Sequence, residues 1–255
     1  WGSHHFDTSR YPNVAQMMQT LHDENTHLII SVWARFDTNI YNANALAAVN
    51  GLYTNVLANV YPAGYGQWYD PFNPEARQVY WDEIATNLFN LGIDGWWFDA
   101  SEPELSGHWG EFRSYHTAAG PGARVFNAYP LMHTTSAYEG QRATDPNKRV
   151  FILTRSAWAG QQRNAAVTWS GDINGTFPVL AQQIAAGLNF SISGIPYWNT
   201  DTGGFNDGSP TDPAYDELFT RWFQFSAFCP LLRLPGPNDK AIYNFPSSTQ
   251  AILID

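Results

Sequence analysis

At residues 92–104 the sequence reads GIDGWWFDASEPE, a short apolar segment that runs directly into a cluster of acidic residues. Residues 93–98 predict a buried strand of the kind found in parallel sheets covered on both faces. In barrels of alternating strands and helices, catalytic groups lie at the carboxyl ends of the strands. Asp99, which follows the strand, is therefore the first candidate for a catalytic group. From this stretch alone, an alternative in which Asp99 only caps a turn and Trp96 and Trp97 only fill the core has equal standing.

The composition favours one sizeable domain that binds a flat, polar ligand. Of the 255 residues, 44% are apolar, 16% are aromatic and only 14% are charged, which argues against disorder. Many aromatic rings suit the flat faces of sugars, although a large aromatic core must also use many of them. The net charge of −10 argues against a nucleic-acid partner. No apolar run approaches the roughly 20 residues that a membrane span needs.

The sequence contains no recognisable metal, cofactor or disulfide motif. The single cysteine, Cys229, excludes an internal disulfide. The histidines lack ligand spacing with cysteines or acidic residues, so we expect no metal site; they stand at positions 4, 5, 22, 27, 108, 116 and 133.

Strands and helices alternate along the chain. Strands are expected at 27–34, 93–98, 150–154, 166–170, 191–197 and from Leu231, and helices at 12–25, 73–91, 129–141, 177–188 and 216–228. Residues 35–72 are expected to form an irregular excursion. This alternation is typical of parallel strands covered by helices. Polar side chains follow five strand ends and so predict one shared face; they are Asp99, Arg155, Asp172, Asp201 and Arg233.

The pattern favours an α/β fold, a (β/α)8 TIM barrel. A doubly wound sheet would usually carry a glycine-rich phosphate loop after a strand, and none is found. A barrel face with carboxylates, tryptophan-rich walls and no cofactor motif suggests glycoside hydrolysis, which needs two carboxyl groups. Asp99 and Asp172 can supply them from different strands. Glu102 and Glu104 are expected to orient the loop or a neighbour, and Asp94, at the opposite end of its strand, is expected to be structural.

Several stretches, in order along nearly the whole chain, carry a resemblance to a known family. They are WWFDASEPE at 96–104, TRSAWAGQQR at 154–163, WSGD at 169–172, PYWNTDTGGF at 196–205 and NPEAR at 73–77. Together they resemble glycoside hydrolase family 31. The two-tryptophan form of the first stretch is most similar to the α-xylosidase branch of that family.

The resemblance implies a role for individual residues. Asp99 would be the nucleophile of a retaining α-glycosidase, Asp172 the acid that then acts as base, and Arg155 a ligand of sugar hydroxyls close to the carboxylates. Asp201 would hold Arg155 or a hydroxyl. Four aromatic residues would form walls of the sugar pocket, with plain core packing as the alternative for the first and last; they are Trp33, Trp97, Trp169 and Phe205.

The sequence departs from the family pattern in two ways. Residues 1–255 are expected to be a single catalytic-barrel region, incomplete at both ends, with about six of the eight strands. The second departure is Pro235, which stands where the family usually has a histidine that contacts the bound sugar.

The sequence therefore predicts a retaining α-glycosidase acting on oligosaccharides, most of all on α-xylosides of plant cell walls, with no cofactor and no metal. An α-glucosidase of the same family is the first alternative. A non-catalytic carbohydrate-binding relic is the alternative from another class, which the missing strands and Pro235 favour and intact Asp99 and Asp172 oppose. The sequence does not give the oligomeric state or the compartment; secretion or a periplasmic location is favoured only by the polysaccharide substrate.

Overall fold

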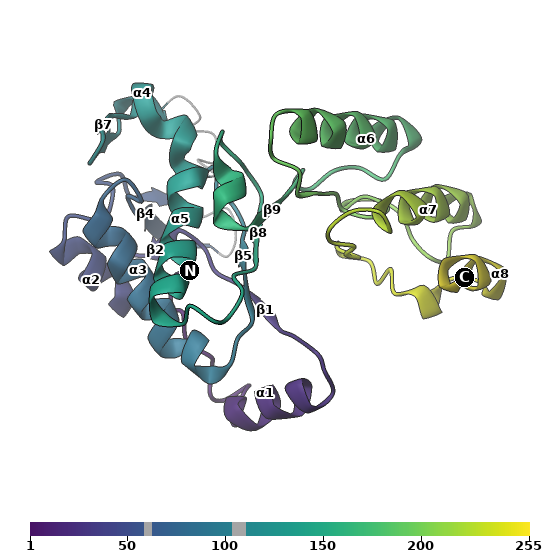
Figure 1. Cartoon of the computed structure of the whole chain (residues 1–255), viewed down its shortest axis with the longest axis horizontal. Helices are drawn as coiled ribbons and strands as arrows, with labels where there is room; N and C mark the ends of the chain where they lie inside the picture. Colours follow the sequence, from purple (N-terminus) through teal and green to yellow (C-terminus); the bar gives the residue numbers. More distant parts are fainter. Residues whose placement is uncertain (59–62, 104–110) are drawn as a thin grey trace. The chain divides into compact units, whose positions relative to one another are not determined.

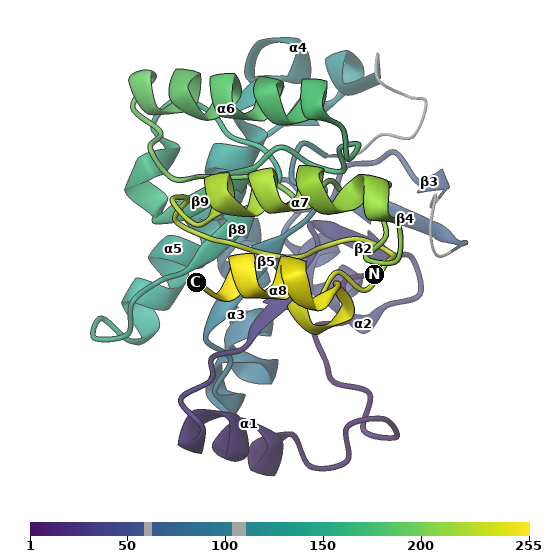
Figure 2. The ribbon, with the colours of Figure 1, turned by 90° about the vertical axis from the view of Figure 1, so that its right-hand side faces the viewer.

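The computed structural model describes residues 1–58, 63–103 and 111–255, drawn as ribbons in Figures 1 and 2. The chain divides into two compact units, Trp1–Ala166 and Val167–Asp255. Within the described ranges, no helix combines the length and the apolar character that a bilayer crossing requires.

The first unit is built around three parallel strands with β5 in the centre. They are β1 (Ile29–Ser31), β5 (Gly95–Phe98) and β8 (Ile152–Thr154). In the register of this sheet, Trp97 pairs with Ser31 of β1 and with Leu153 of β8. Because the strands are parallel, the residues that follow β5 and β8 emerge at the same edge of the sheet. This register brings Asp99 and Arg155 to one edge.

The helix start at Asn73 and the stop at Gly92 are both found where the sequence predicts them. The side chain of Asn73 accepts hydrogen bonds from the backbone N–H groups of Glu75 and Ala76, at 2.9 and 3.4 Å, and Pro74 occupies the first helical position. Gly92 ends the following 3-10 turn in a left-handed conformation, with φ of 103°. The three long helices are α1 (Val14–Asp23), α3 (Pro74–Asn87) and α5 (Tyr129–Thr144). All three were expected from the sequence, the first two from their apolar spacing, although their bounds differ from those expected by up to a few residues.

The segment 35–72 departs from the alternating pattern, but it is more regular than the sequence suggests. Its strands form an antiparallel sheet in the order β2-β4-β3. They are β2 (Arg35–Asp37), β3 (Leu57–Ala58) and β4 (Tyr65–Trp68), with helix α2 (Tyr41–Ala48) between β2 and β3. The remaining short elements of the first unit are η1 (Phe89–Leu91), η2 (Glu111–Ser114), β6 (His116–Thr117), β7 (Gly120–Pro121), α4 (Gly122–Val125), η3 (Phe126–Ala128) and η4 (Gln161–Asn164).

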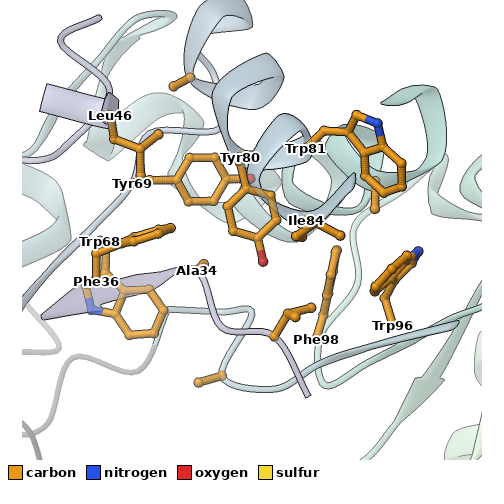
Figure 3. Packing of buried hydrophobic residues seen from close by; sticks show 14 of the residues in the cluster. Ala34, Phe36, Leu46, Trp68, Tyr69, Tyr80, Trp81, Ile84, Trp96 and Phe98 are labelled. Atoms are coloured by element: carbon orange, nitrogen blue, oxygen red, sulfur yellow. The ribbon is translucent and has the colours of Figure 1, made fainter. Parts of the chain in front are cut away.

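Aromatic rings dominate the core behind β5, as Figure 3 shows. The rings of Tyr69 and Tyr80 stack with centroids 4.6 Å apart, and Trp96 meets Trp81 edge-on at 5.7 Å. Phe98 is fully buried. A large share of the aromatic residues therefore fills the core, as the alternative reading of the composition required. Packing of this density fixes the strand that leads to Asp99.

The second unit contains two parallel strands and three helices, of which β9 and the helices are labelled in Figures 1 and 2. They are β9 (Ala166–Trp169), α6 (Phe177–Ile192), β10 (Trp198–Asn199), α7 (Pro213–Ser226) and α8 (Ser247–Ile254), with the 3-10 turn η5 (Ile242–Asn244) before α8. Its core includes Phe219 stacked on Phe245, with centroids 4.2 Å apart. Thr176 and Asp212 cap α6 and α7 through their side chains.

Two predicted strands of this unit are wrong. The strand expected at 191–197 is instead the end of α6, which continues to Ile192, followed by a turn and then β10. The alternation in residues 190–195 resembles a strand, but the helix ends only where Gly194 adopts a left-handed φ of 84°. Leu231 and Leu232 have no regular secondary structure.

Candidate active site

A sharp turn at the carboxyl end of β5 holds the carboxylate of Asp99. The backbone N–H of Ala100 donates a hydrogen bond of 2.8 Å to Oδ1 of Asp99. Ala100 is fully buried and has a φ of 51°, a conformation that alanine rarely adopts. A backbone donor favours an ionised carboxylate. The strained residue therefore directs a hydrogen bond to the group expected to be the nucleophile.

Arg155 lies between two carboxylates. It follows β8, and its backbone N–H donates to the carbonyl of Phe98 at 3.2 Å. Its Nη1 lies 3.1 Å from Oδ1 of Asp99, and its Nε donates to Oε1 of Glu102 at 2.7 Å. The side chains of Arg155, Asp99 and Glu102 are 15%, 22% and 30% exposed, respectively. One guanidinium thus bridges both carboxylates and holds them in a fixed geometry.

The turn is also anchored to the neighbouring strand by hydroxyl groups. Oγ of Ser101 lies 2.8 Å from Oγ1 of Thr154 and 3.0 Å from Oγ of Ser156. Ser101 and Thr154 are fully buried. These hydroxyl contacts therefore link the turn after β5 directly to the end of β8.

Glu102 holds Arg155, in agreement with the orienting role expected from the sequence. Burial raises the pKa of Glu102, although the adjacent guanidinium acts in the opposite direction and the charge of Asp99 adds to the increase. Within the described ranges, its second oxygen has no hydrogen-bond partner. The other carboxylate of the acidic cluster, Glu104, lies outside the described residues.

Two tryptophans stand near the same ends of β1 and β5. Trp33 follows β1 and is half-buried; its ring stacks on Trp1 with centroids 4.0 Å apart, and Trp68 lies parallel to it at 6.3 Å. Trp97 on β5 is also half-buried. Partly exposed indole faces at strand ends suit contact with sugar rings.

In the second unit, β9 leads through Ser170 and Gly171 to Asp172. Gly171 has a left-handed φ of 82°, and Asp172 is exposed. Trp169, the last residue of β9, is only 1% exposed, and the guanidinium of Arg233 lies over its ring at 4.8 Å. Phe205 is half-buried, and its backbone N–H donates to the carbonyl of Ile173 at 2.7 Å.

Arg233 is also the partner of Asp201. Its Nε and Nη2 donate to Oδ1 of Asp201 at 3.1 and 2.5 Å. Asp201 is fully buried. Burial raises its pKa to about 6 against the effect of Arg233, and the negative charge of Asp172 adds to the increase. The polar ends of β9 and β10 therefore share one electrostatic environment within this unit.

The loop after Arg233 is packed against the residues around Phe205. A Cβ at Gly236, which has a φ of 116°, would lie 2.5 Å from the carbonyl oxygen of Phe205. Lys240 is 1% exposed, and its ammonium donates to the carbonyl of Gly204. Burial lowers the pKa of Lys240, whereas the charges of Asp201 and Asp207 oppose that effect. Pro235 lies in this loop, which has no regular secondary structure at that point.

A family model described as the TIM-barrel domain of glycosyl hydrolases family 31 matches residues 1–255. The chain belongs to glycoside hydrolase family 31. The family fold confirms the α/β barrel predicted from the alternation of strands and helices.

Relatives within family 31 include several α-xylosidases. The chain is 42% identical over 258 residues to an α-xylosidase of Saccharolobus solfataricus, a match that covers 100% of this chain and 34% of the relative. It is 30% identical over 262 residues to α-xylosidase A of Aspergillus niger, covering 90% and 36%. The chain thus spans about a third of the length of these curated relatives.

Solved family 31 structures agree with this assignment. The family 31 α-xylosidase of Xanthomonas citri superposes with a TM-score of 0.91 at 35% identity, over 99% of this chain and 30% of that one. A family 31 α-xylosidase from a soil metagenome, solved in complex with xylose, gives 0.89 at 34% identity, over 99% and 40%.

The structure places the predicted family 31 residues in two groups, one in each unit. Trp33, Trp97, Asp99 and Arg155 lie at strand ends of the first unit, where Asp99 and Arg155 are in direct contact. In the second unit Trp169 and Asp201 contact the same residue, Arg233, while Asp172 and Phe205 lie on the chain nearby.

Three features were missed from the sequence. The strained Ala100 gives no sequence signal, because alanine has no preference for a left-handed conformation. The ion pair of Asp201 with Arg233 joins residues 32 positions apart, and the only sequence signal for it was that both were expected to follow strands, which the structure does not show for Arg233. A buried Lys240 runs against the usual exposure of lysine.

Proposed function

We propose that the protein is a retaining α-glycosidase that removes terminal α-linked sugars, with α-xylosides of plant cell-wall oligosaccharides as its main substrates. The observation that carries this proposal is the Asp99 carboxylate, which receives the N–H of Ala100 and faces the guanidinium of Arg155. Both contacts favour an ionised carboxylate at the carboxyl end of a barrel strand, as a nucleophile requires.

The reaction would proceed in two displacements. Asp99 attacks the anomeric carbon and forms a glycosyl ester, while Asp172 gives its proton to the departing glycosidic oxygen. Asp172 then takes a proton from water, the water attacks the same carbon, and Asp99 leaves as a carboxylate. The sugar is released with its original anomeric configuration.

The remaining residues would bind and orient the sugar. Arg155 fixes Asp99 and is placed to contact hydroxyls near it, and the half-buried rings of Trp33, Trp97 and Phe205 offer flat faces. Trp169, because it is almost fully buried under Arg233, would act mainly by supporting that arginine. Asp201 in turn would hold Arg233 in place for a sugar hydroxyl.

The preference for xylosides rests on the relatives, since α-xylosidases of Saccharolobus solfataricus and Aspergillus niger are 42% and 30% identical to this chain. An α-glucosidase remains the alternative, supported by 28% identity to α-glucosidase 2 of Bacillus thermoamyloliquefaciens. Xylose and glucose differ by one hydroxymethyl group, so the space that the pocket leaves for this group determines which substrate is preferred.

The test uses the full-length protein with 4-nitrophenyl α-xyloside and α-glucoside, and follows the released sugar by NMR. We expect turnover of the xyloside with retention. Asp172→Ala should still cleave this activated aryl glycoside slowly and should be accelerated by azide, whereas Asp207→Ala, a control at an exposed carboxylate of the same unit, should behave as wild type. Inversion, or loss without azide rescue, would contradict the mechanism. No turnover of any glycoside combined with sugar binding would favour the carbohydrate-binding relic.

A further inference from the structure

The opposite end of β5 carries a cluster that the proposed reaction does not use. Asp94 directly precedes β5, His22 lies in the last turn of α1, and His27 lies in the segment between α1 and β1. Nε2 of His22 is 3.0 Å from Oδ2 of Asp94, and Nδ1 of His27 is 3.4 Å from Oδ1. One ligand atom from each residue lies within 4.8 Å of the other two.

The carboxylate at the centre of this cluster is fixed in place. It accepts a hydrogen bond of 2.9 Å from the backbone N–H of Leu28, and Lys148 lies 3.2 Å from its Oδ1. Asp94 is 12% exposed, whereas His27 is 72% exposed and open to solvent.

We propose that His22, His27 and Asp94 form a zinc-binding site at the amino-terminal end of β5. Two imidazole nitrogens, one carboxylate oxygen and a water make a tetrahedral set that Zn²⁺ commonly accepts. Bonds of about 2.0–2.2 Å to zinc separate neighbouring tetrahedral donors by roughly 3.3–3.5 Å; here the two imidazole nitrogens lie 3.0 and 3.4 Å from different oxygens of Asp94, and the three donor atoms lie within 4.8 Å of one another. Only small side-chain movements would bring all three donors onto one ion.

The sequence spacing concealed this group. His22 and Asp94 are 72 positions apart and meet only in the folded chain. The sequence predicted no metal site because its histidines lack ligand spacing along the chain, whereas the fold brings two of them next to Asp94. The Asp94 side chain, expected to be structural, is the residue that gathers the cluster.

Lys148 limits the affinity of the site. Its ammonium lies beside Oδ1, so its charge opposes a bound cation, and the zinc is expected to use Oδ2. Lys148→Gln keeps a hydrogen-bond donor near the carboxylate but removes the charge. This variant should therefore bind zinc about tenfold more tightly, a change of roughly 1.4 kcal/mol.

Zinc at this site would join the end of α1 and its connecting segment to the start of β5. Because a ligand that binds only the folded state raises its stability, zinc should raise the midpoint of thermal unfolding. The site lies at the strand end away from Asp99, so zinc should leave glycosidase activity unchanged. The proposal is therefore independent of the proposed function.

The experiment titrates ZnCl₂ into the metal-free full-length protein at neutral pH by calorimetry, together with thermal unfolding. We expect one zinc whose affinity falls at least tenfold in His22→Asn and in His27→Asn, rises in Lys148→Gln, and is unchanged in His116→Asn, which removes an exposed histidine on β6. The two histidine variants alter surface side chains and should fold normally. Absence of zinc binding by the wild type, or binding that neither histidine variant weakens, would overturn the proposal and leave the cluster as an ion-pair network.

Discussion

Replacing Arg155 tests whether one guanidinium organises the acidic turn after β5. In Arg155→Ala, Asp99 and Glu102 lose the cation that contacts both of them at 3.1 and 2.7 Å. Hydrogen bonds to charged groups contribute about 1.5–3 kcal/mol each. The three side chains are 15–30% exposed, and solvent screening reduces that figure. We therefore expect the free energy of unfolding to fall by about 1–2 kcal/mol.

The effect on catalysis should be larger than the effect on stability. Misplacement of a reacting group by about 1 Å can cost roughly 100-fold in rate, and Asp99 would lose one of the contacts that orient it. We expect kcat/KM for 4-nitrophenyl α-xyloside to fall about 100-fold in Arg155→Ala. The acidic limb of its pH profile should move to higher pH, because the cation that favours an ionised Asp99 is absent.

Matched variants separate charge from geometry. Arg155→Lys keeps the charge but contacts one carboxylate at a time, so it should recover most of the stability and little of the activity. Glu102→Gln keeps the size of the side chain and should reduce kcat/KM by about tenfold. The measurements are chemical unfolding and steady-state kinetics on the full-length protein. An Arg155→Ala variant with wild-type stability and kcat/KM within a factor of two would refute the reasoning.

Three further predictions follow from the site. The raised pKa of Asp201 means that the folded state binds this proton more tightly than the unfolded state does. The free energy of unfolding should therefore fall by up to about 3 kcal/mol as pH rises from 3.8 to about 6. Chemical unfolding of Asp201→Asn should show a weaker pH dependence, and an identical dependence in both proteins would contradict this prediction. Ala100→Gly relieves the left-handed strain but also loses a buried methyl group, and because these two free energies are similar, the stability of this variant should stay within about 1 kcal/mol of wild type. Ala100→Val should be less stable than wild type by about 2 kcal/mol or more, and equal stability of the two variants would contradict this prediction. Lys240→Met loses the hydrogen bond to Gly204, the residue before Phe205, so Phe205 should be held less firmly and KM should rise, while Asp99 and kcat are unaffected. A lower kcat with unchanged KM would exclude this positioning role.

The central strand and its catalytic candidate could be predicted because their signals are local. An apolar segment followed by Asp99, and the Asn73-Pro74 helix start, need only neighbouring residues to be interpreted. The proximity of Arg155 to Asp99 could also be predicted, because parallel strands bring their carboxyl ends to one edge of the sheet.

Features that depend on distant partners could not be predicted in the same way. The ion pair of Asp201 with Arg233 and the gathering of His22 and His27 around Asp94 depend on strand pairing and on loop paths. The end of α6 was misjudged because the alternating residues before Gly194 favour a strand locally, while the helix continues through them.

The most direct test of the account is to trap the covalent intermediate. The full-length protein would be incubated with 5-fluoro-α-xylosyl fluoride, which forms the glycosyl ester quickly and hydrolyses slowly, and the labelled peptide would be identified by mass spectrometry. The account predicts one sugar per protein, attached to Asp99. A label on Asp172 or Glu102, or turnover with inversion and no label, would contradict it.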